Sequence, residues 1–291
     1  MIGIISAFGA AISWTYACFI WRSHTEKYKS IEINLVKNII AFIIFLPAFI
    51  NIQKFTDFKS LLILLLSGAV GIGLGDTFYI KSLQVIGTRR TLSVETLSPL
   101  LAALSGEIFI NENLALRSYV GIVIISISLF ILLRQKTNLL VNNQTKIAEE
   151  DNLKIYIFPF ISVFCAVLGG LLSRMVFLER DLSPFQATEI RLLGAIIFLI
   201  SIKNFRVNFF LNKLDNNAQK RFLISIFLGT NIGILLQQIV FKTLPLGIGW
   251  TLLSTSPVIS LFFATKEEGQ LTKGIIFFTI FLFLGLCLII L

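Results

Sequence analysis

Long apolar runs are the feature that most restricts how this chain can fold. A helix needs about 20 mostly apolar residues to cross the hydrocarbon core of a bilayer, and the 291 residues contain ten runs of about that kind. Hydrophobic residues make up 56% of the chain and charged residues 14%, whereas soluble domains have about 45–50% and 25%. We therefore expect an all-α integral membrane protein with helices over 2–21, 34–51, 60–81, 91–110, 117–133, 155–174, 184–202, 222–242, 246–265 and 273–291.

Two polar stretches, 134–154 and 203–221, interrupt the apolar runs. The first lies near the middle of the chain and leaves five runs on each side. We therefore predict a five-helix unit over 1–133, a polar linker over 134–154 and a second five-helix unit over 155–291.

An internal repeat relates the two predicted units. Four residues of the first unit have an identical residue 158 positions later in the second. These are Gly71 and Gly229, Gly75 and Gly233, Ser98 and Ser256, and Pro99 and Pro257. An odd number of helices in each unit forces the two units into opposite orientations, which is the inverted repeat of many secondary transporters. We expect the glycines to serve close helix packing, and the two prolines to kink the fourth and ninth helices.

Charged residues inside the apolar runs are the main candidates for function, because a charge at the bilayer centre costs about 2.5–3.5 kcal/mol on insertion scales. Asp76 is expected about 6–9 Å from the end of the third helix, and Glu95 about one turn into the fourth. Three interpretations stay open. Both acids belong to an ion cluster with Lys81, Arg89 and Arg90, or one of them faces a central cavity and binds a substrate amine or a proton, or both are simply exposed at the membrane interface. In the second unit, Glu189 is expected to pair with Arg191 or with Arg174.

The stretch "GDTFYIKSLQVIGTRRTLSVETLSPLLAALSGEIFINENLALRSYVGIVI" resembles the EamA-type repeat of the drug/metabolite transporter superfamily. The residues that carry the resemblance are Gly75, Asp76, Pro99, Glu112 and Gly121. The second half retains Pro257, and Glu267 or Glu268 stands where the family has its glutamate. Arg191 matches an arginine that the family often has in the second helix of a repeat, and Lys37 is its nearest equivalent in the first half. The resemblance implies ten helices in two repeats and the transport of small metabolites.

These observations predict a secondary transporter that moves a small organic solute, such as an amino acid or another metabolite, by alternating access around a midplane cavity. Export is one direction open to it, and a proton or solute gradient would drive it, since the chain has no Walker A pattern for ATP. The predicted substrate-binding residues are Trp14, Tyr16, Asp76, Tyr79, Glu95, Ser98, Gln237, Gln238, Trp250 and Ser254. The alternatives are a membrane sensor or assembly partner without transport activity, and a lipid-modifying enzyme.

Other features exclude several classes of site. One histidine and scattered acids do not supply a metal centre or an enzyme's catalytic group, so we expect no metal, no cofactor and no enzymatic activity. The three cysteines lie in apolar runs and do not form a disulfide pattern. The net charge of +9 is assigned to loops beside anionic lipid and not to nucleic-acid binding.

The orientation in the membrane is a point on which two arguments disagree. Most of the 25 Lys and Arg residues are assigned to the side opposite the termini, which the positive-inside rule would place in the cytoplasm. The resemblance implies cytoplasmic termini, and we follow it, with the inner membrane of a bacterium as the expected location. The sequence leaves the oligomeric state open.

Overall fold

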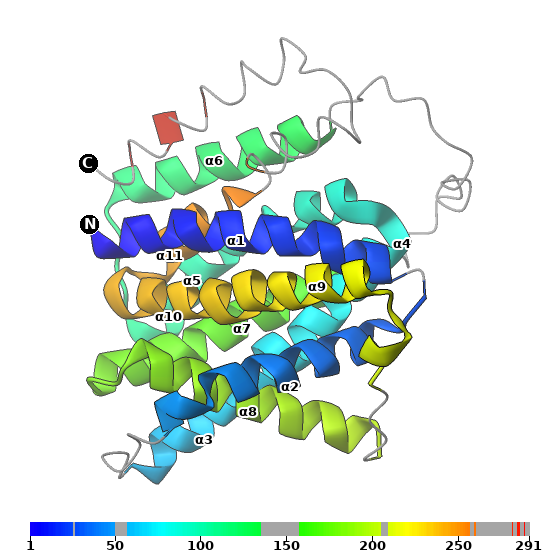
Figure 1. Cartoon of the computed structure of the whole chain (residues 1–291). Coiled ribbons are helices and arrows are strands. Elements are labelled where there is room, and N and C mark those ends of the chain that lie inside the picture. Colours follow the sequence, from blue (N-terminus) through cyan, green and yellow to red (C-terminus); the bar gives the residue numbers. More distant parts are fainter. Residues whose placement is uncertain are drawn as a thin grey trace.

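The described part of the chain is a bundle of helices (Figure 1). The computed structural model describes residues 1–25, 27–49, 57–134, 157–204, 209–256 and the single positions 259, 281, 284, 285 and 288. No strand occurs within these residues. The elements are α1 (Ile2–His24), α2 (Ser30–Phe49), α3 (Phe58–Ser67), η2 (Gly68–Gly75), α4 (Asp76–Glu95), α5 (Ser98–Ile110), α6 (Leu116–Arg134), α7 (Ile157–Glu179), α8 (Pro184–Ile202), η5 (Leu211–Lys213), α9 (Asn216–Ser225), η6 (Ile226–Ile232), α10 (Gly233–Thr243) and α11 (Leu246–Leu253).

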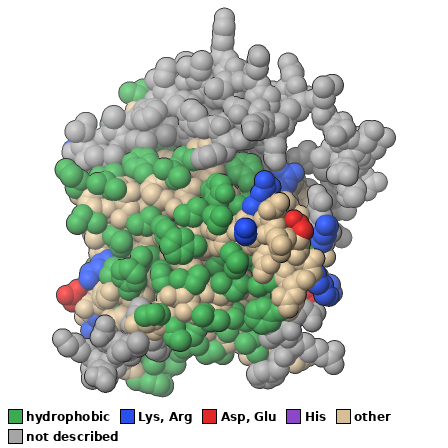
Figure 2. All heavy atoms as spheres, viewed as in Figure 1, with side chains coloured by type: hydrophobic (Ala, Val, Ile, Leu, Met, Phe, Trp, Pro, Cys, Tyr) green, Lys and Arg blue, Asp and Glu red, His purple; other side chains and the backbone are tan. Residues whose placement is uncertain are grey.

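Six helical stretches of the described residues are long and apolar enough to cross a membrane. They are Ile2–His24, Ser30–Pro47, Phe58–Gly87, Ile157–Glu179, Pro184–Ile202 and Asn216–Thr243. Figure 2 shows hydrophobic side chains across the middle of one face and charged side chains towards its left and right margins, as expected for a lipid-facing band. The predicted fourth and fifth helices correspond to the shorter apolar helices Ser98–Ile110 and Leu116–Ser128. The predicted tenth helix lies almost wholly outside the described residues, so the count of ten stays a prediction.

The third helix is longer than predicted, and Asp76 consequently lies deeper in the bundle. α3, η2 and α4 follow one another without a break to Gly87, whose φ of 79° interrupts the helix. This left-handed conformation suits glycine, which has no Cβ. Asp76 is 11 residues before Gly87, about 16 Å along a helix that rises about 1.5 Å per residue. The predicted 6–9 Å was therefore wrong, because the predicted helix ended at residue 81.

The fourth helix is broken before Ser98 and is not merely kinked. α4 ends at Glu95, and α5 starts at Ser98 with Pro99 in its first turn. A proline is tolerated there because the first turn of a helix has no partner for its backbone N–H groups. The same break follows α11, since the hydrogen bond from Leu97 N to Val94 O recurs 158 residues later, from Thr255 N to Leu252 O. Pro257 lies outside the described residues.

Two π-helices also recur at this offset, because η2 begins at Gly68 and η6 begins at Ile226. In η2 two backbone carbonyls accept hydrogen bonds from a side chain of α2, with Asn34 Nδ2 donating to Ile72 O at 2.9 Å and to Gly73 O at 3.0 Å. Such segments are often found at functional sites, and both π-helices lead directly into cavity-lining residues described below.

Glycines of η2 and η6 bring neighbouring helices into close contact, as the sequence predicted for the repeated glycines. A Cβ on Gly71 would lie 3.2 Å from Gly169 Cα, and one on Gly229 only 2.3 Å from Ala17 Cβ. The nearest atoms to a Cβ on Gly75 are 3.4 Å away, and those around Gly233 are at ordinary contact distance. The packing role is therefore confirmed most clearly for Gly71 and Gly229.

Ion pairs join the two halves mainly at one end of the bundle. We call this end the N side; α1 begins there and α2, α7 and α10 end there, on the left in Figure 1. Three ion pairs on the N side link residues of 1–133 to residues of 155–291, whereas the other end has one such described pair, Lys203–Glu32 at 2.9 Å. The three are Arg174–Glu112 at 2.6 Å, Arg180–Asp57 at 3.3 Å and Lys59–Glu179 at 3.4 Å.

Hydrogen bonds also stabilise the ionised form of two loop carboxyls on the N side. The Ser60 hydroxyl donates to Asp57, and Lys242 donates to Asp181 at 2.5 Å, and each bond holds the pKa of its carboxyl below the usual value. Because these folded-state pKa values are lower than those of the unfolded chain, both carboxylates stabilise the fold at neutral pH. That contribution is lost as the pH falls through the folded-state values.

The Arg174–Glu112 pair is the best connected of the N-side contacts. Glu112 also accepts a hydrogen bond from Leu246 N at 2.7 Å, and Arg174 Nη1 donates to the carbonyls of Phe241 and Lys242, each at 2.9 Å. The two side chains are only 12% and 11% exposed. The pair therefore joins the loop after α5 to α7 and to the turn between α10 and α11.

We expect Arg174→Met to lower the free energy of unfolding by about 2–3 kcal/mol, because it leaves the Glu112 carboxylate and two carbonyls without their donor. Lys59→Met is the matched control. Its pair with Glu179 is exposed, and such pairs contribute about 0–1 kcal/mol. Thermal unfolding in detergent measures both, and equal melting temperatures for the two variants would contradict the expectation.

Candidate functional site

A cavity lies between the helices near the middle of α1 and of the Phe58–Gly87 span. Its volume, taken as the space open to the centre of a water molecule, is about 100 Å³. One water needs roughly 10–15 Å³ by this measure, so the cavity can hold several waters or a small solute. Residues of α1, η2, α4, α5, α7, α8, α10 and α11 line it. Both halves of the chain therefore form its wall.

Asp76 and Lys37 form a buried ion pair at the cavity wall. Lys37 Nζ donates to Asp76 Oδ2, and the Lys37 side chain is fully buried. The ammonium group also lies 4.7 Å from the centre of the Trp21 ring and 5.7 Å from that of Trp14, within the range of cation–π attraction. The Asp76 carboxylate, which faces the cavity, is thus balanced by a cation behind it.

This pairing corrects the ion cluster predicted from the sequence. Lys81 donates to Gln84 Oε1 at 2.9 Å and not to Asp76. The side chains of Arg89 and Arg90 lie outside the described residues. The predicted pairing of Asp76 with Lys81 was wrong because it placed the end of the third helix close to Asp76, whereas the helix continues to Gly87. The part of the prediction that concerns Arg89 and Arg90 stays a prediction.

Glu95 and Arg191 line the same cavity and have no ion-pair partner among the described residues. Glu95 ends α4 and is half-buried. Arg191 is 2% exposed, and its Nε and Nη1 atoms have no hydrogen-bond partner within the described chain. Among the described residues, the cavity therefore offers a carboxylate from the first half and a guanidinium from the second, neither of which is held in an ion pair.

The predicted pairing of Glu189 with Arg191 or Arg174 was also wrong. Arg174 binds Glu112, and both oxygens of Glu189 lack a hydrogen-bond partner in the described structure. Residues two apart on a helix point to different faces. Arg191 accordingly lines the cavity, whereas Glu189 is fully buried outside it.

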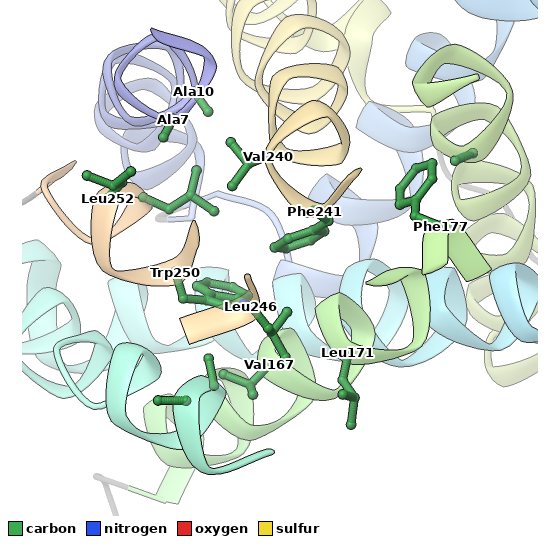
Figure 3. Close-up of a cluster of buried hydrophobic side chains, with 14 of the residues drawn as sticks. Ala7, Ala10, Val167, Leu171, Phe177, Val240, Phe241, Leu246, Trp250 and Leu252 are labelled. Carbon is green, nitrogen blue, oxygen red and sulfur yellow. The ribbon is translucent and has the colours of Figure 1, made fainter. Parts of the chain in front are cut away.

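Aromatic side chains form the apolar part of the wall. The rings of Trp14 and Tyr79 are 5.7 Å apart, and the Tyr79 hydroxyl lies 3.1 Å from Cys18 Sγ. Trp250 packs against Phe241 with ring centres 5.8 Å apart. Figure 3 shows Trp250 beside Leu246, inside a cluster of buried hydrophobic residues that holds the indole in place. Its Nε1 group has no partner among the described residues.

A comparison with protein families matches this chain twice. The model of the EamA-like transporter family matches residues 1–134 and again residues 153–291. The chain belongs to the EamA-like transporter family. It is therefore an integral membrane protein of a family of transporters, in agreement with the apolar helices described above.

Solved structures share the fold of this EamA-like transporter. One, described only as a crystal structure of a protein, has a TM-score of 0.74 and 13% sequence identity over 98% of this chain and 95% of its own. Because the identity is so low, this likeness speaks for the fold alone. A comparison with curated proteins found no match.

Most of the predicted binding residues line the cavity of this EamA-like transporter. These are Trp14, Asp76, Tyr79, Glu95, Ser98, Gln237, Trp250 and Ser254. Two do not line it. Tyr16 is 36% exposed on α1, and Gln238 is fully buried beside the cavity-lining Gln237. Neighbouring positions on a helix differ by about 100° in direction, so only one of two adjacent polar residues faces the cavity.

Sequence reasoning did not select several lining residues. Arg191 was expected in a structural ion pair, and Ser162 of α7 gave no signal in an apolar run. Gly71 and Gly233 line the cavity as well as packing the helices. Arg191 could have been found from its match to the family arginine, because an intramembrane arginine without a nearby acid on its own face suggests a binding site.

Proposed function

We propose that this EamA-like transporter moves a small organic solute, such as an amino acid or a related metabolite, across the membrane by alternating access around the central cavity. The observation that carries the proposal is that opposite halves of the chain contribute Glu95 and Arg191 to one cavity, and that neither has an ion-pair partner among the described residues. Intramembrane charges are rare and usually line substrate or ion pathways.

The charge pattern favours a zwitterionic solute. A carboxylate of the solute would bind the Arg191 guanidinium, and its ammonium would bind Glu95, so that each buried charge gains a partner. Trp14, Tyr79 and Trp250 would contact an apolar side chain, and Gln237 and Ser254 would donate or accept hydrogen bonds. The cavity volume of about 100 Å³ limits the solute to a small one.

We further propose that the two halves, 1–133 and 155–291, are inverted five-helix repeats joined by the polar linker 134–154. The breaks before Ser98 and Ser256, and the π-helices η2 and η6, recur at the same offset of 158 residues and support this relationship. Broken helices at the interface of two repeats commonly form the binding site of secondary transporters. Rocking of the halves would then break the three N-side ion pairs and open the cavity to that side.

Glu95→Gln tests the binding role in liposomes that contain the purified protein. With a mixture of radiolabelled standard amino acids as the probe, we expect exchange across the membrane to fall at least about tenfold, because a charge-assisted bond contributes about 1.5–3 kcal/mol. Glu107→Gln, a change of the same kind at an exposed site outside the cavity and outside the N-side ion pairs, is the control. Normal exchange by Glu95→Gln would remove Glu95 from the site.

A sensor or assembly partner without transport activity is the second candidate function. It predicts that the probe raises the melting temperature of the wild-type protein without any movement across the liposome membrane. Release of a modified lipid from the same liposomes would instead support an enzyme. Exchange by the wild-type protein contradicts the sensor function.

A further inference from the structure

Glu189 is a buried acid that the proposed transport site does not use. It lies on α8, five positions after the first residue Pro184, and its exposed fraction is 0%. Neither carboxyl oxygen has a hydrogen-bond partner among the described residues. An ionised carboxylate in such a position would lose its hydration without gaining a hydrogen bond or a counter-ion among the described residues, which costs several kcal/mol or more. A protonated carboxyl is neutral and avoids most of that cost.

The elements that pack against α8 supply no free cation for Glu189. These elements are η2, α2, α3 and α10. Their charged side chains, each already bonded to a group other than Glu189, are Glu32 with Lys203, Lys37 with Asp76, Lys59 with Glu179, and Lys242 with Asp181. η2 contributes no titratable side chain, and on α8 itself Arg191 points to a different face. Within the described chain, then, the neutral acid is the form that this environment favours.

We propose that Glu189 is the proton-binding site of this transporter. The carboxyl keeps its proton while Glu189 is buried. When α8 rearranges and exposes the group, the carboxyl releases the proton to water and becomes a carboxylate. The carboxylate takes up a proton again before Glu189 returns to its buried position. Arg191 moves with the same helix, so solute binding at Arg191 and proton binding at Glu189 bias the same conformational change. The coupling rests on the proposed function, whereas proton binding by Glu189 does not.

Infrared spectroscopy of the purified protein in detergent tests proton binding directly. At neutral pH we expect the wild-type spectrum to contain the carbonyl band of a protonated carboxylic acid, and Glu189→Gln to lose that intensity. Glu189→Asp keeps the acid and is expected to shift the band, which provides a second reading should Glu189→Gln not fold. The control, Glu179→Gln, removes an exposed carboxylate and leaves the band unchanged. A band that is absent, or that persists unaltered in both Glu189 variants, overturns the proposal.

Transport in liposomes tests the coupling, with the radiolabelled amino-acid mixture as the probe and a pH-sensitive dye inside the vesicles. We expect an imposed proton gradient to drive accumulation by the wild-type protein, and Glu189→Gln to reduce that accumulation about tenfold, within the usual range of coupling between two ligands. Exchange without a gradient should change less than about twofold in this variant, because the cavity residues are intact.

The outcomes separate this proposal from the proposed function. Wild-type protein that moves none of the amino-acid mixture, either by exchange or under a proton gradient, counts against transport of these solutes. The infrared result then still decides whether Glu189 binds a proton. Wild-type exchange that ignores the gradient, or gradient-driven accumulation retained by Glu189→Gln, leaves transport standing and overturns the role of Glu189 in coupling.

Discussion

Replacing Lys37 by methionine is expected to lower the free energy of unfolding by about 3–5 kcal/mol, the usual cost of removing one member of a buried ion pair. The change leaves the Asp76 carboxylate without its cation inside the bundle. It also removes the ammonium group from the faces of Trp14 and Trp21, where each cation–π contact contributes about 0.5–2 kcal/mol. Thermal and denaturant unfolding in detergent, followed by tryptophan fluorescence, measures the loss.

The double variant Lys37→Met with Asp76→Asn separates the ion pair from simple packing. With both charges gone no uncompensated carboxylate remains, and we expect stability to return to within about 1–2 kcal/mol of the wild type. Asp76→Asn alone is expected to be unstable, because the buried ammonium then has no anion. A single Lys37→Met variant as stable as the wild type would show that the pair does not hold α2 against α4.

Gly68→Ala is expected to prevent assembly of the bundle. A Cβ at position 68 would lie 1.9 Å from the backbone oxygen of Arg191, far inside any contact distance, and a backbone group cannot move aside as a flexible side chain can. η2 and α8 would have to separate, which would expose their packed faces and shift Arg191 at the cavity. We expect a loss of more than about 3 kcal/mol, seen as aggregation on size-exclusion chromatography in detergent.

Gly75→Ala is the matched control in the same π-helix. The atoms nearest to a Cβ there, led by Cys165 Cβ, are 3.4 Å away, so one methyl group fits with little adjustment. This variant should purify as a single species with a melting temperature close to that of the wild type. Equal behaviour of the two glycine variants would mean that backbone contact between η2 and α8 does not limit the fold.

The amino-acid sequence alone is sufficient for the helical membrane class and the family. A membrane helix satisfies its own backbone hydrogen bonds, so its existence depends on local composition and length. The runs that begin at residues 2, 60, 155 and 184 accordingly correspond to observed spans. The offset of 158 residues, read from a few glycines, serines and prolines, also relates the two helix breaks and the two π-helices.

The apolar pattern of the sequence was a less reliable guide to helix ends where a helix is irregular. An apolar run does not reveal that Gly87 adopts a positive φ, or that the fourth helix stops at Glu95 and starts again at Ser98. Both errors concern the backbone geometry at one or a few positions within an apolar run. The error at Gly87 also led to a wrong predicted depth for Asp76 and to the wrong ion-pair partner.

The sequence by itself determined which polar residues stand inside the membrane, because each interrupts an apolar run. Only the tertiary structure decided which of them meet. Lys37 and Asp76 are 39 positions apart and Glu112 and Arg174 are 62 apart, and both pairs form because segments far apart in the sequence pack side by side. Glu189 and Arg191 are close in sequence, yet the turn of one helix directs them to different surroundings. In lipid, no water compensates a polar group, so its partner or lack of one depends on the neighbouring helices.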